Sequence, residues 1–423
     1  MLKIKFINHA CIQIFYDDFS LLIDPWFSGK VFNDSWCLLK DSDLADIDFE
    51  SLRFIVISHE HPDHLNFETL KKIYNLKNDI TCIFPNRADK TVKKVIEKIG
   101  FKFMFLKQNT EKFFLNDKDY IKFFSNKPEG DHTIALSIKE KVIINQNDDY
   151  TDDDIIKKIN KEFKFVDILF TQFSLAGYYG NSNNHNLIKK NGHDFHLNRI
   201  VDYQKKFNAK IVVPFASFVY FCKVTNKYLN KFAVKPDEVL KSLGNKVCQL
   251  VFLNDEVYFD DRFMTRNSIN LKKLENLFNL NNLKFYESKT IDEKEIINVI
   301  NSKLFDMSLI KKINTLTNKF SLKKILHGLF KFIILLKPIR IKLTDSNKII
   351  EINFLTNYTK LSKNKYGKID FEIPSEELLY MFKFPWGSDT ANITATVNYY
   401  SKRSFYFFEY HLKYYHIYGA KFF

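Results

Sequence analysis

The sequence predicts an α/β fold for most of the chain, followed by a helical segment and a small α+β domain. Apolar runs of strand length alternate with amphipathic stretches of helix length over roughly the first 260 residues, as in domains that cover a mixed sheet with helices. Asn- and Lys-rich helical patterns follow, and strand patterns then return. A length of 423 residues suits two or three domains. We therefore expect domains at 1–262, 263–337 and 338–423.

Three short strands open the chain. Residues 2–7 and 11–16 are predicted to pair around a turn that contains His9. Residues 20–23 form a third predicted strand, which ends at Asp24. Two polar side chains therefore stand at strand ends in one hairpin system.

The segment Ser-His-Glu-His-Pro-Asp-His at 58–64 concentrates three imidazoles and two carboxylates. It follows the apolar run 54–57 and precedes a helical pattern at 65–73, so we expect it on a strand-to-helix loop. Loops at the carboxyl ends of strands line the crevice where open α/β sheets place their sites, and Pro62 limits the conformations of this loop. The pattern indicates a metal site.

Imidazole and carboxylate groups suit zinc, iron or manganese. Four possible ligands on one tight turn are more than one ion easily takes from a single loop, so we expect two adjacent ions. His59 and His61 would serve one ion, and Asp63 and His64 the other. The alternatives are a surface histidine cluster, or an Asp63 that only caps the following helix.

The pattern His-x-His-x-Asp-His resembles the signature of the metallo-β-lactamase superfamily, whose members share an αββα sandwich and a site for one or two metal ions. Over about residues 1–260 the sequence also resembles the metallo-β-lactamase-like part of CMP-N-acetylneuraminate hydroxylases and their bacterial relatives. Those hydroxylases carry a Rieske iron–sulfur domain as well, and we expect no electron supply of that kind within this chain. The residues that carry this likeness are Asp24-Pro25-Trp26-Phe27-Ser28-Gly29, Phe32-Asn33, Trp36, Val213-Pro214-Phe215-Ala216 and Lys227-Tyr228.

The resemblance implies further site residues. An aspartate at the position of Asp24 braces the metal-binding loop without binding metal. A third histidine for the first ion comes from a segment just ahead of a strand, which points to His132. The alternatives are an inward-facing Asp131 or an exposed turn histidine. His9 stands where relatives often show His-Ala, and it is either a pocket residue or a structural hydrogen-bonding group.

The bridging aspartate of the superfamily follows a strand, as Asp148 follows the predicted strand 142–144. A bridging carboxylate holds two cations close together and orients the shared water. Alternatively, the acids from 148 to 154 only favour the start of a helix at 153–161, where the helix dipole attracts negative charge. We expect that second role for residues 152–154.

The last ligand of the second ion departs from the superfamily pattern. Many members supply a histidine from a strand near 211–214, whereas this sequence has Phe-Ala-Ser at 215–217. His193 and His196, just before a predicted helix at 197–207, could compensate. Alternatively, they are exposed residues at the start of that helix, and one well-occupied ion has a weaker neighbour.

Two loops are candidates for substrate contact. Residues 30–50 form a predicted irregular connection with Trp36 and several acids, and its length and aromatic content suit a lid. The Gly-, Tyr- and Asn-rich loop at 172–186 suits recognition of a sugar or nucleotide. It suits a plain surface loop equally well.

Strand patterns beyond residue 338 surround one helix, which begins with Ser375 as its cap. This arrangement resembles a sterol-carrier-type α+β domain, at the level of fold only. Such a domain could cover the site, mediate homo-oligomer formation or hold an apolar group. The strands are expected at 340–343, 348–354, 367–373, 393–399 and 405–408.

Lys and Arg number 64 against 50 Asp and Glu, a net charge of +14. This charge favours an anionic small-molecule substrate, although a Lys-rich solvated surface is the alternative. The basic residues are dispersed, so we expect no nucleic-acid partner. The basic stretch 310–343 suits peripheral contact with an anionic membrane, or a helix that packs one domain on another. Five cysteines without paired spacing, and an N-terminus that begins as a strand, make a cytoplasmic location the expectation.

These residues favour a metal-dependent hydrolase in which one or two zinc or iron ions, or manganese, activate water. Asp63 or Asp148 would manage the proton. The hydroxylase resemblance and the positive charge suggest an anionic carbohydrate or nucleotide-sugar substrate. The alternative is a non-haem iron oxygenase that hydroxylates a nucleotide sugar with a separate electron donor. A binding scaffold without activity is a third reading, and the intact motif argues against it.

Overall fold

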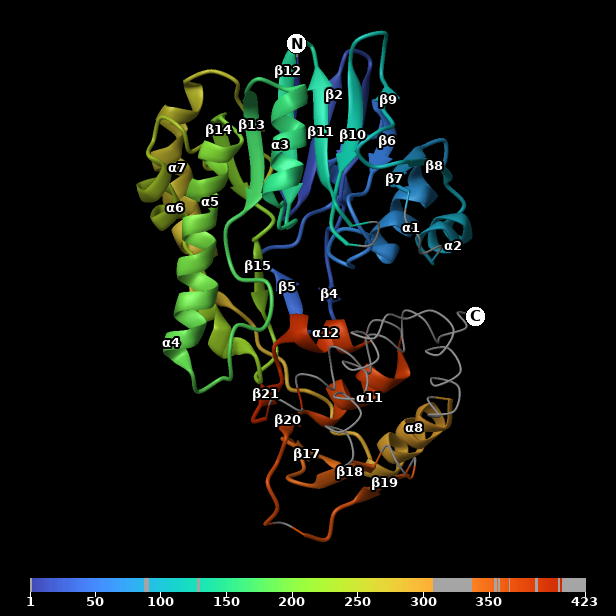
Figure 1. The fold of residues 1–423 in the computed structure, drawn as a ribbon. Coiled ribbons are helices and arrows are strands. Elements are labelled where there is room, and N and C mark those ends of the chain that lie inside the picture. The colour runs from blue at the N-terminus through green and yellow to red at the C-terminus, as the bar shows by residue number, and fades with distance from the viewer. Residues whose placement is uncertain are drawn as a thin grey trace, which may run out of the picture.

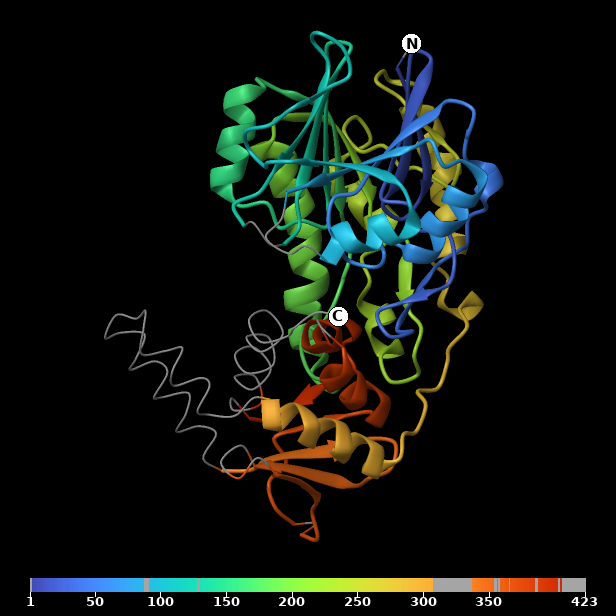
Figure 2. The ribbon, with the colours of Figure 1, turned by 90° about the vertical axis from the view of Figure 1, so that its right-hand side faces the viewer.

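In the computed structural model, two β-sheets pack face to face, and helices cover the outer face of each (Figure 1). Figure 2 shows the same layers from the side, with helices on both flanks. A smaller unit from the C-terminal part of the chain lies beneath the sandwich in both views. The structure describes residues 2–86, 91–127, 130–306, 337–401 and 404, with gaps at 354–355, 357, 365 and 385–386.

The first sheet has the order β16-β1-β2-β3-β6-β7-β8. Its strands are β1 (Lys3–Asn8), β2 (Cys11–Tyr16), β3 (Phe19–Ile23), β6 (Leu52–Val56), β7 (Thr81–Pro85), β8 (Lys102–Leu106) and β16 (Glu256–Val257). β1 to β3 form antiparallel pairs, and β3, β6, β7 and β8 run parallel. The carboxyl ends of β3 and β6 therefore lie side by side, which brings Asp24 next to the 58–64 loop.

The second sheet has the order β14-β13-β12-β11-β10-β9. Its strands are β9 (Phe113–Phe114), β10 (Tyr120–Phe124), β11 (Thr133–Ile138), β12 (Lys141–Asn147), β13 (Val166–Gln172) and β14 (Ala209–Phe215). β11 and β12 are antiparallel, with Ile134 opposite Asn145. The residues just before β11 and just after β12 therefore meet at one end of this sheet, and both segments carry predicted ligands.

Apolar side chains fill the space between the two sheets. Phe6 and Ile14 from the first sheet and Phe123 and Leu136 from the second share one cluster, and all four are fully buried. Burying each such side chain contributes about 1.5–3 kcal/mol. A separate cluster packs α1 and α2 against the outer face of the first sheet. This layering confirms the predicted α/β fold class in its αββα form.

The α-helices associated with the sandwich are α1 (Phe67–Leu76), α2 (Thr91–Ile99), α3 (Asp153–Glu162), α4 (His185–Ile188), α5 (Phe195–Lys206), α6 (Pro236–Leu243) and α7 (Arg262–Leu277). α3 begins after Asp152, whose carboxylate accepts hydrogen bonds from the backbone N–H groups of Asp154 and Ile155. Burial alone would raise the pKa of Asp152, but hydrogen bonds from Ile155 and Asn126 together lower it. The cap therefore stabilises the helix in its ionised form.

The connection at 30–50 is not wholly irregular. Trp36 is buried and packs its ring against Phe32 and Phe221. Burial of these aromatic rings explains why the segment pairs as strands. The small sheet consists of β4 (Lys30–Val31), β5 (Trp36–Leu38) and β15 (Val219–Phe221).

The C-terminal unit has a five-stranded sheet of order β19-β18-β17-β20-β21. Its elements are α8 (Glu293–Asp306), β17 (Ile339–Leu343), β18 (Ile349–Asn353), β19 (Tyr358–Leu361), β20 (Phe371–Ile373), α11 (Ser375–Lys383), α12 (Gly387–Thr394) and β21 (Asn398–Tyr399). The strand predicted at 393–399 is wrong over most of its length, because helix α12 extends to Thr394. Ala391 is buried in this unit's core, and Thr394 Oγ1 donates to its carbonyl at 2.9 Å. The strand predicted at 405–408 lies outside the described residues, and the sterol-carrier likeness stays a prediction.

The described part of 263–337 packs partly against the sandwich and partly against the C-terminal unit. α7 packs Phe263 and Leu274 into the sandwich core, whereas α8 packs Ile296 and Ile300 against the C-terminal sheet. The division follows from where each helix places its apolar side chains. The proposed domain boundaries themselves stay a prediction.

Residues 307–336, and with them most of the basic stretch 310–343, lie outside the described residues. In the part of the chain that the structure describes, no helix combines the length and the apolar character that crossing a bilayer requires.

The sandwich and the C-terminal unit are joined through buried polar contacts. Lys223 is 2% exposed, and its Nζ lies 2.6 Å from Glu377 Oε1 and 3.0 Å from Glu376 Oε2. The 172–186 loop also meets this unit, since Asn181 exchanges two hydrogen bonds with the backbone of Tyr399. That loop therefore packs against the C-terminal unit at this point.

Candidate metal centre

The 58–64 loop leaves the end of β6 and enters α1. Asn66 caps this helix, because its side-chain oxygen accepts a hydrogen bond of 3.0 Å from the backbone N–H of Thr69. Asp63 is buried and takes no part in the cap. The capping alternative for Asp63 is therefore excluded, and its carboxylate is available to the site.

Asp24 braces this loop from the end of β3. Its Oδ1 accepts a hydrogen bond of 2.8 Å from Ser58 N, and its Oδ2 accepts one of 2.7 Å from Ser58 Oγ. Its Oδ2 also lies 2.9 Å from His64 Nδ1. All three residues are fully buried. This is the geometry expected of an aspartate that orients a ligand loop without binding metal.

The brace fixes which nitrogen of two rings carries the proton. A carboxylate only accepts hydrogen bonds, so His64 donates through Nδ1–H and keeps a lone pair on Nε2. Ser58 Oγ gives its hydrogen to Asp24, so it accepts from Nδ1–H of His59, 2.9 Å away. His59 Nε2 is then also unprotonated. Both rings present the nitrogen that a metal ion requires.

One group of possible ligand atoms consists of His59 Nε2, His61 Nδ1 and Asp131 Oδ1. The two ring nitrogens lie 2.9 Å apart, and the Asp131 oxygen is 3.4 Å from the first and 3.9 Å from the second. Asp131, the alternative to His132 in the sequence analysis, thus belongs to this group.

His132 lies next to this group but belongs to none of the three groups of possible ligands found in the described residues. Its Nδ1 is 2.9 Å from the Gly130 carbonyl oxygen and must donate to it, which leaves Nε2 as the unprotonated nitrogen. That tautomer suits a metal ligand, so a ligand role for His132 stays a prediction.

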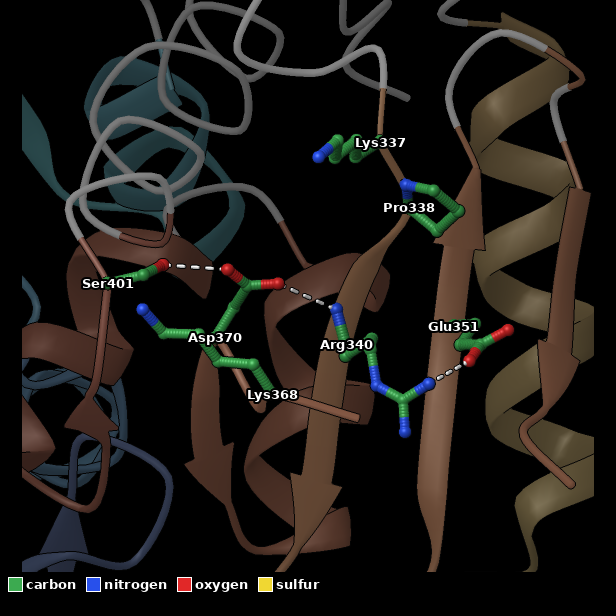
Figure 3. A pocket seen from close by; sticks show the side chains of 7 residues that line it. All are labelled: Lys337, Pro338, Arg340, Glu351, Lys368, Asp370 and Ser401. Carbon is green, nitrogen blue, oxygen red and sulfur yellow. Dashed lines mark hydrogen bonds and ion pairs between the residues drawn. The ribbon is translucent and has the colours of Figure 1, made fainter. Parts of the chain in front are cut away.

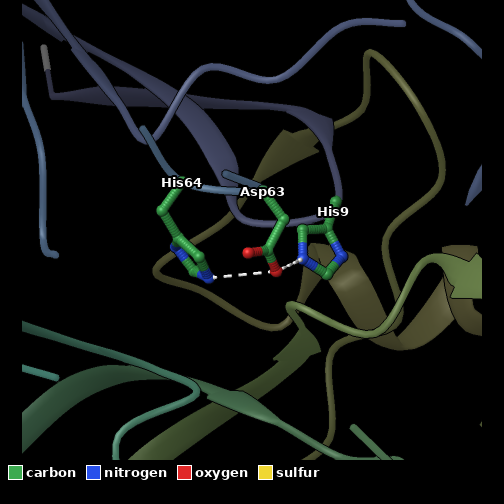
Figure 4. A group of neighbouring side chains, drawn as sticks. All are labelled: His9, Asp63 and His64. Carbon is green, nitrogen blue, oxygen red and sulfur yellow. Dashed lines mark hydrogen bonds and ion pairs between the residues drawn. The ribbon is translucent and has the colours of Figure 1, made fainter. Parts of the chain in front are cut away.

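A second group consists of His9, Asp63 and His64 (Figure 4). Asp63 Oδ2 lies 3.2 Å from His9 Nε2 and 3.5 Å from His64 Nε2. All three side chains are at most 3% exposed. The sequence pointed to Asp63 and His64 here, and the structure adds His9 from the β1–β2 turn.

Asp148 lies between the two groups. Its Oδ1 is 3.6 Å from His59 Nε2 and 3.5 Å from His64 Nε2. Burial alone would raise the pKa of Asp148, but the imidazoles of His59 and His64 lower it well below its usual value. A carboxylate in this place fits a bridge between two cations.

The electrostatics of the cluster favour a bound cation. Imidazole nitrogens and carboxylate oxygens face one another here, and His64 Nε2 lies 3.5 Å from Asp148 Oδ1. Burial lowers the pKa of His64, but the carboxylates of Asp148 and Asp63 raise it well above its usual value. A proton on His64 would therefore compete with a metal ion for this nitrogen. The donor set of imidazoles and carboxylates fits zinc, iron or manganese.

His193 and His196 are not brought to either group. His193 pairs with Asp194 at 2.9 Å and with Glu238 at 3.1 Å. His196 is buried, and its Nδ1 accepts from Arg199 while its Nε2 contacts Tyr179 Oη at 2.7 Å. Both nitrogens of His196 are thus engaged by protein groups.

Aromatic residues border the cluster. Phe32 lies edge-on to His61 with 5.8 Å between ring centroids, and Trp26 lies edge-on to His9 at 5.7 Å. The side chains of His61 and Asp131 remain 33% and 27% exposed. The cluster is therefore open to solvent on the side of His61 and Asp131, next to Phe32 in the 30–50 segment.

The C-terminal unit carries a cavity of about 530 Å³ (Figure 3). Arg340 pairs with Glu351 there, and Asp370 accepts hydrogen bonds from Arg340 N and Ser401 Oγ. None of its lining residues belongs to the candidate metal centre. They are Lys337, Pro338, Arg340, Glu351, Lys368, Asp370 and Ser401.

Comparison with known families places this cluster in context. The model of the beta-lactamase superfamily domain matches residues 3–151, the stretch from β1 to just beyond β12. Residues 3–151 are thus similar to a beta-lactamase superfamily domain. The domain contains Asp24, the 58–64 loop and Asp148, and it confirms the resemblance first seen in the His-x-His-x-Asp-His pattern.

The chain is also similar to curated hydroxylases beyond this domain. Over 266 residues it is 25% identical to the cytidine monophosphate-N-acetylneuraminic acid hydroxylase of Danio rerio, a match that covers 58% of this chain and 43% of that protein. Over 86 residues it is 36% identical to the inactive human protein of that name, covering 20% of this chain and 17% of the relative. The chain matches less than half the length of these relatives.

Solved structures include similar folds. One is a metallo hydrolase from Ignicoccus hospitalis, with 14% identity, a TM-score of 0.42, and coverage of 60% of this chain and 97% of that one. Another is CmlA, a diiron beta-hydroxylase from Streptomyces venezuelae, with 12% identity, a TM-score of 0.40, and coverage of 60% and 54%.

Proposed function

We propose that this protein is a metal-dependent hydrolase that acts on an anionic carbohydrate or nucleotide-sugar substrate. The observation that carries the proposal is the convergence of imidazole nitrogens and carboxylate oxygens at the junction of the two sheets. The carboxylates repel one another unless a cation lies between them, and imidazole nitrogens are good ligands for such a cation. One or two divalent ions held there would act as Lewis acids and lower the pKa of water toward neutrality.

The two carboxylates expected to act in catalysis differ in position. Asp63 is 3% exposed and lies on the closed side, between His9 and His64. Asp148 is 16% exposed and faces both groups. We assign transfer of the water proton to Asp148, because its carboxylate is within reach of a substrate on the open side. Asp63 holds the inner part of the site.

Arg199 supports an anionic substrate. Its side chain on α5 is buried and stacks on Tyr150, with 4.1 Å from the guanidinium carbon to the ring centroid. Within the described residues no carboxylate lies in ion-pair range of it, and its Nε and Nη1 have no hydrogen-bond partner. Tyr150 is two residues beyond Asp148. A buried guanidinium that lacks an anionic partner and stacks on this tyrosine favours a carboxylate or phosphate on the substrate.

One observation favours a second candidate, a non-haem iron oxygenase. The zebrafish relative is named a hydroxylase, and imidazole and carboxylate ligands suit iron as well as zinc. In this candidate the substrate is a nucleotide sugar and a separate protein supplies electrons. Oxygen and a reductant are then required, whereas hydrolysis needs neither.

The test starts from protein purified without chelators or oxygen, with metal identity and number measured per chain. Ester, phosphoester, amide and nucleotide-sugar substrates are then incubated with it under nitrogen. Turnover under nitrogen supports hydrolysis, and Asp148→Asn should lower its rate about 10²–10⁴-fold, as loss of a positioned acid or base does. Turnover that appears only with oxygen and a reductant would replace this proposal by the second candidate.

A further inference from the structure

We propose that His9 is a direct ligand of the second metal ion, which completes a site formed with Asp63, His64 and Asp148. The inference rests on the proposed metal function and concerns how the inner half of the centre is built. It assigns to the β1–β2 turn a role that the sequence reading left between a pocket residue and a structural hydrogen bond.

The distances place His9 among the ligand atoms. Its Nε2 is 3.2 Å from Asp63 Oδ2, which is itself 3.5 Å from His64 Nε2. Figure 4 shows the His9 and His64 rings on either side of the Asp63 carboxylate, with a nitrogen of each ring turned toward it. His9 is 2% exposed, so water does not compete for this nitrogen from the surface. Three ligands from two chain segments thus surround one point.

The backbone around His9 holds the ring in that direction. His9 has a φ of +40°, a left-handed conformation that is uncommon for residues with a side chain. The side chain of Asn8 accepts a hydrogen bond of 3.0 Å from His9 N, and its amide group donates to Lys40 O and Ser42 Oγ. Such strain persists only where surrounding contacts determine it, and it concentrates at functional sites.

The second sheet contributes a backbone hydrogen bond to His9 but no metal-ligating side chain at this position. At the end of β14, Ala216 donates its backbone N–H to His9 O at 2.8 Å. Phe215, Ala216 and Ser217 offer no imidazole or carboxylate at that position. Nε2 of His9 donates to Asp63 Oδ2, whereas Nδ1 has no hydrogen-bond partner among the described residues, so the ring proton can move to Nδ1 when a metal ion binds at Nε2.

The number of metal ions bound per chain distinguishes a His9 that binds metal from a His9 that has only a structural role. His9→Gln keeps a side chain that donates to Asp63 but removes the imidazole, and His9→Ala removes both. Metal-free proteins are titrated with Zn²⁺ by calorimetry, and Co²⁺ absorption spectra are recorded for each. We expect two ions in the unchanged protein and one tight ion in both variants. The second dissociation constant should rise by more than the 10–100-fold typical of supporting residues.

His193→Gln is the control, since His193 pairs with Glu238 outside the cluster, and it should retain both ions. A folded His9→Gln protein that binds two Zn²⁺ ions with unchanged affinity and an unchanged Co²⁺ spectrum would overturn the inference. One ion in the unchanged protein would also overturn it, while leaving the proposed function in place. No bound ion in the unchanged protein would overturn both.

Discussion

Replacing Asp24 removes the carboxylate that holds the 58–64 loop in place. In Asp24→Ala the backbone N–H of Ser58 and the Nδ1–H of His64 both lose a buried acceptor. Each unsatisfied buried donor costs about 1–3 kcal/mol, so the free energy of unfolding should fall by about 2–6 kcal/mol. Ser58 Oγ can donate to His59 Nδ1 once the His59 ring proton moves to Nε2, which limits the loss at that hydroxyl.

Asp24→Asn is the sharper variant, because it keeps the size of the side chain. An amide nitrogen facing His64 would donate to Nδ1 and move the ring proton to Nε2, the nitrogen that a metal ion needs. Zn²⁺ affinity should fall about 10–100-fold, or about 1.4–2.8 kcal/mol. Competition with a chromogenic chelator measures affinity, and urea unfolding of the metal-free protein measures stability. A folded Asp24→Asn protein with unchanged Zn²⁺ affinity would refute this account of the brace.

Three further predictions concern the ligands, the junction and a helix cap. His59→Ala combined with His61→Ala should abolish metal binding with little change in the far-UV circular dichroism spectrum; retained stoichiometric metal would contradict the site. Lys223→Met should lower the free energy of unfolding by about 3–5 kcal/mol, because it leaves the Glu377 carboxylate buried without its cation. The double variant with Glu377→Gln should recover much of that loss in urea titrations, and no recovery would argue against the pair. Asp152→Ala should cost about 1 kcal/mol at pH 7. Because folding lowers the pKa of Asp152, this stabilisation is present above the unfolded pKa of about 3.9 and disappears as pH falls through the folded value; a difference that persists at pH 2 would exclude it.

The sandwich could be predicted because local patterns of apolar and polar residues indicate its strands and helices. The strands predicted at 11–16 and 20–23 correspond to β2 and β3, and the helical pattern at 65–73 overlaps α1. The strand predicted at 393–399 was wrong because the apolar and polar residues there suit either a strand or the end of a buried helix. The preceding Ala391 is buried in the core of the C-terminal unit, and the helix that contains it continues to Thr394.

The site could be predicted from the sequence only where its residues are adjacent along the chain. His59 to His64 form one motif, whereas the choice between Asp131 and His132 depends on how the chain enters β11. The contact between His9 and Asp63 joins residues 54 positions apart, and no local pattern signals it. Ser58, which links Asp24 to His59, also escaped notice, although it opens the motif.

The candidate ligands come from both layers of the sandwich, and this gives a bound ion a mechanical role. His9 and the 58–64 loop follow strands of the first sheet. Asp131 precedes β11 and Asp148 follows β12, both strands of the second sheet. An ion held by both sets would act as a clamp across the seam, since pulling the sheets apart would break its bonds. Ligand at 100 times its dissociation constant adds about 2.7 kcal/mol to the folded state. Without that clamp, Asp148 and its neighbouring carboxylates repel one another across the seam, so chelators should raise the rate at which proteases enter between the layers.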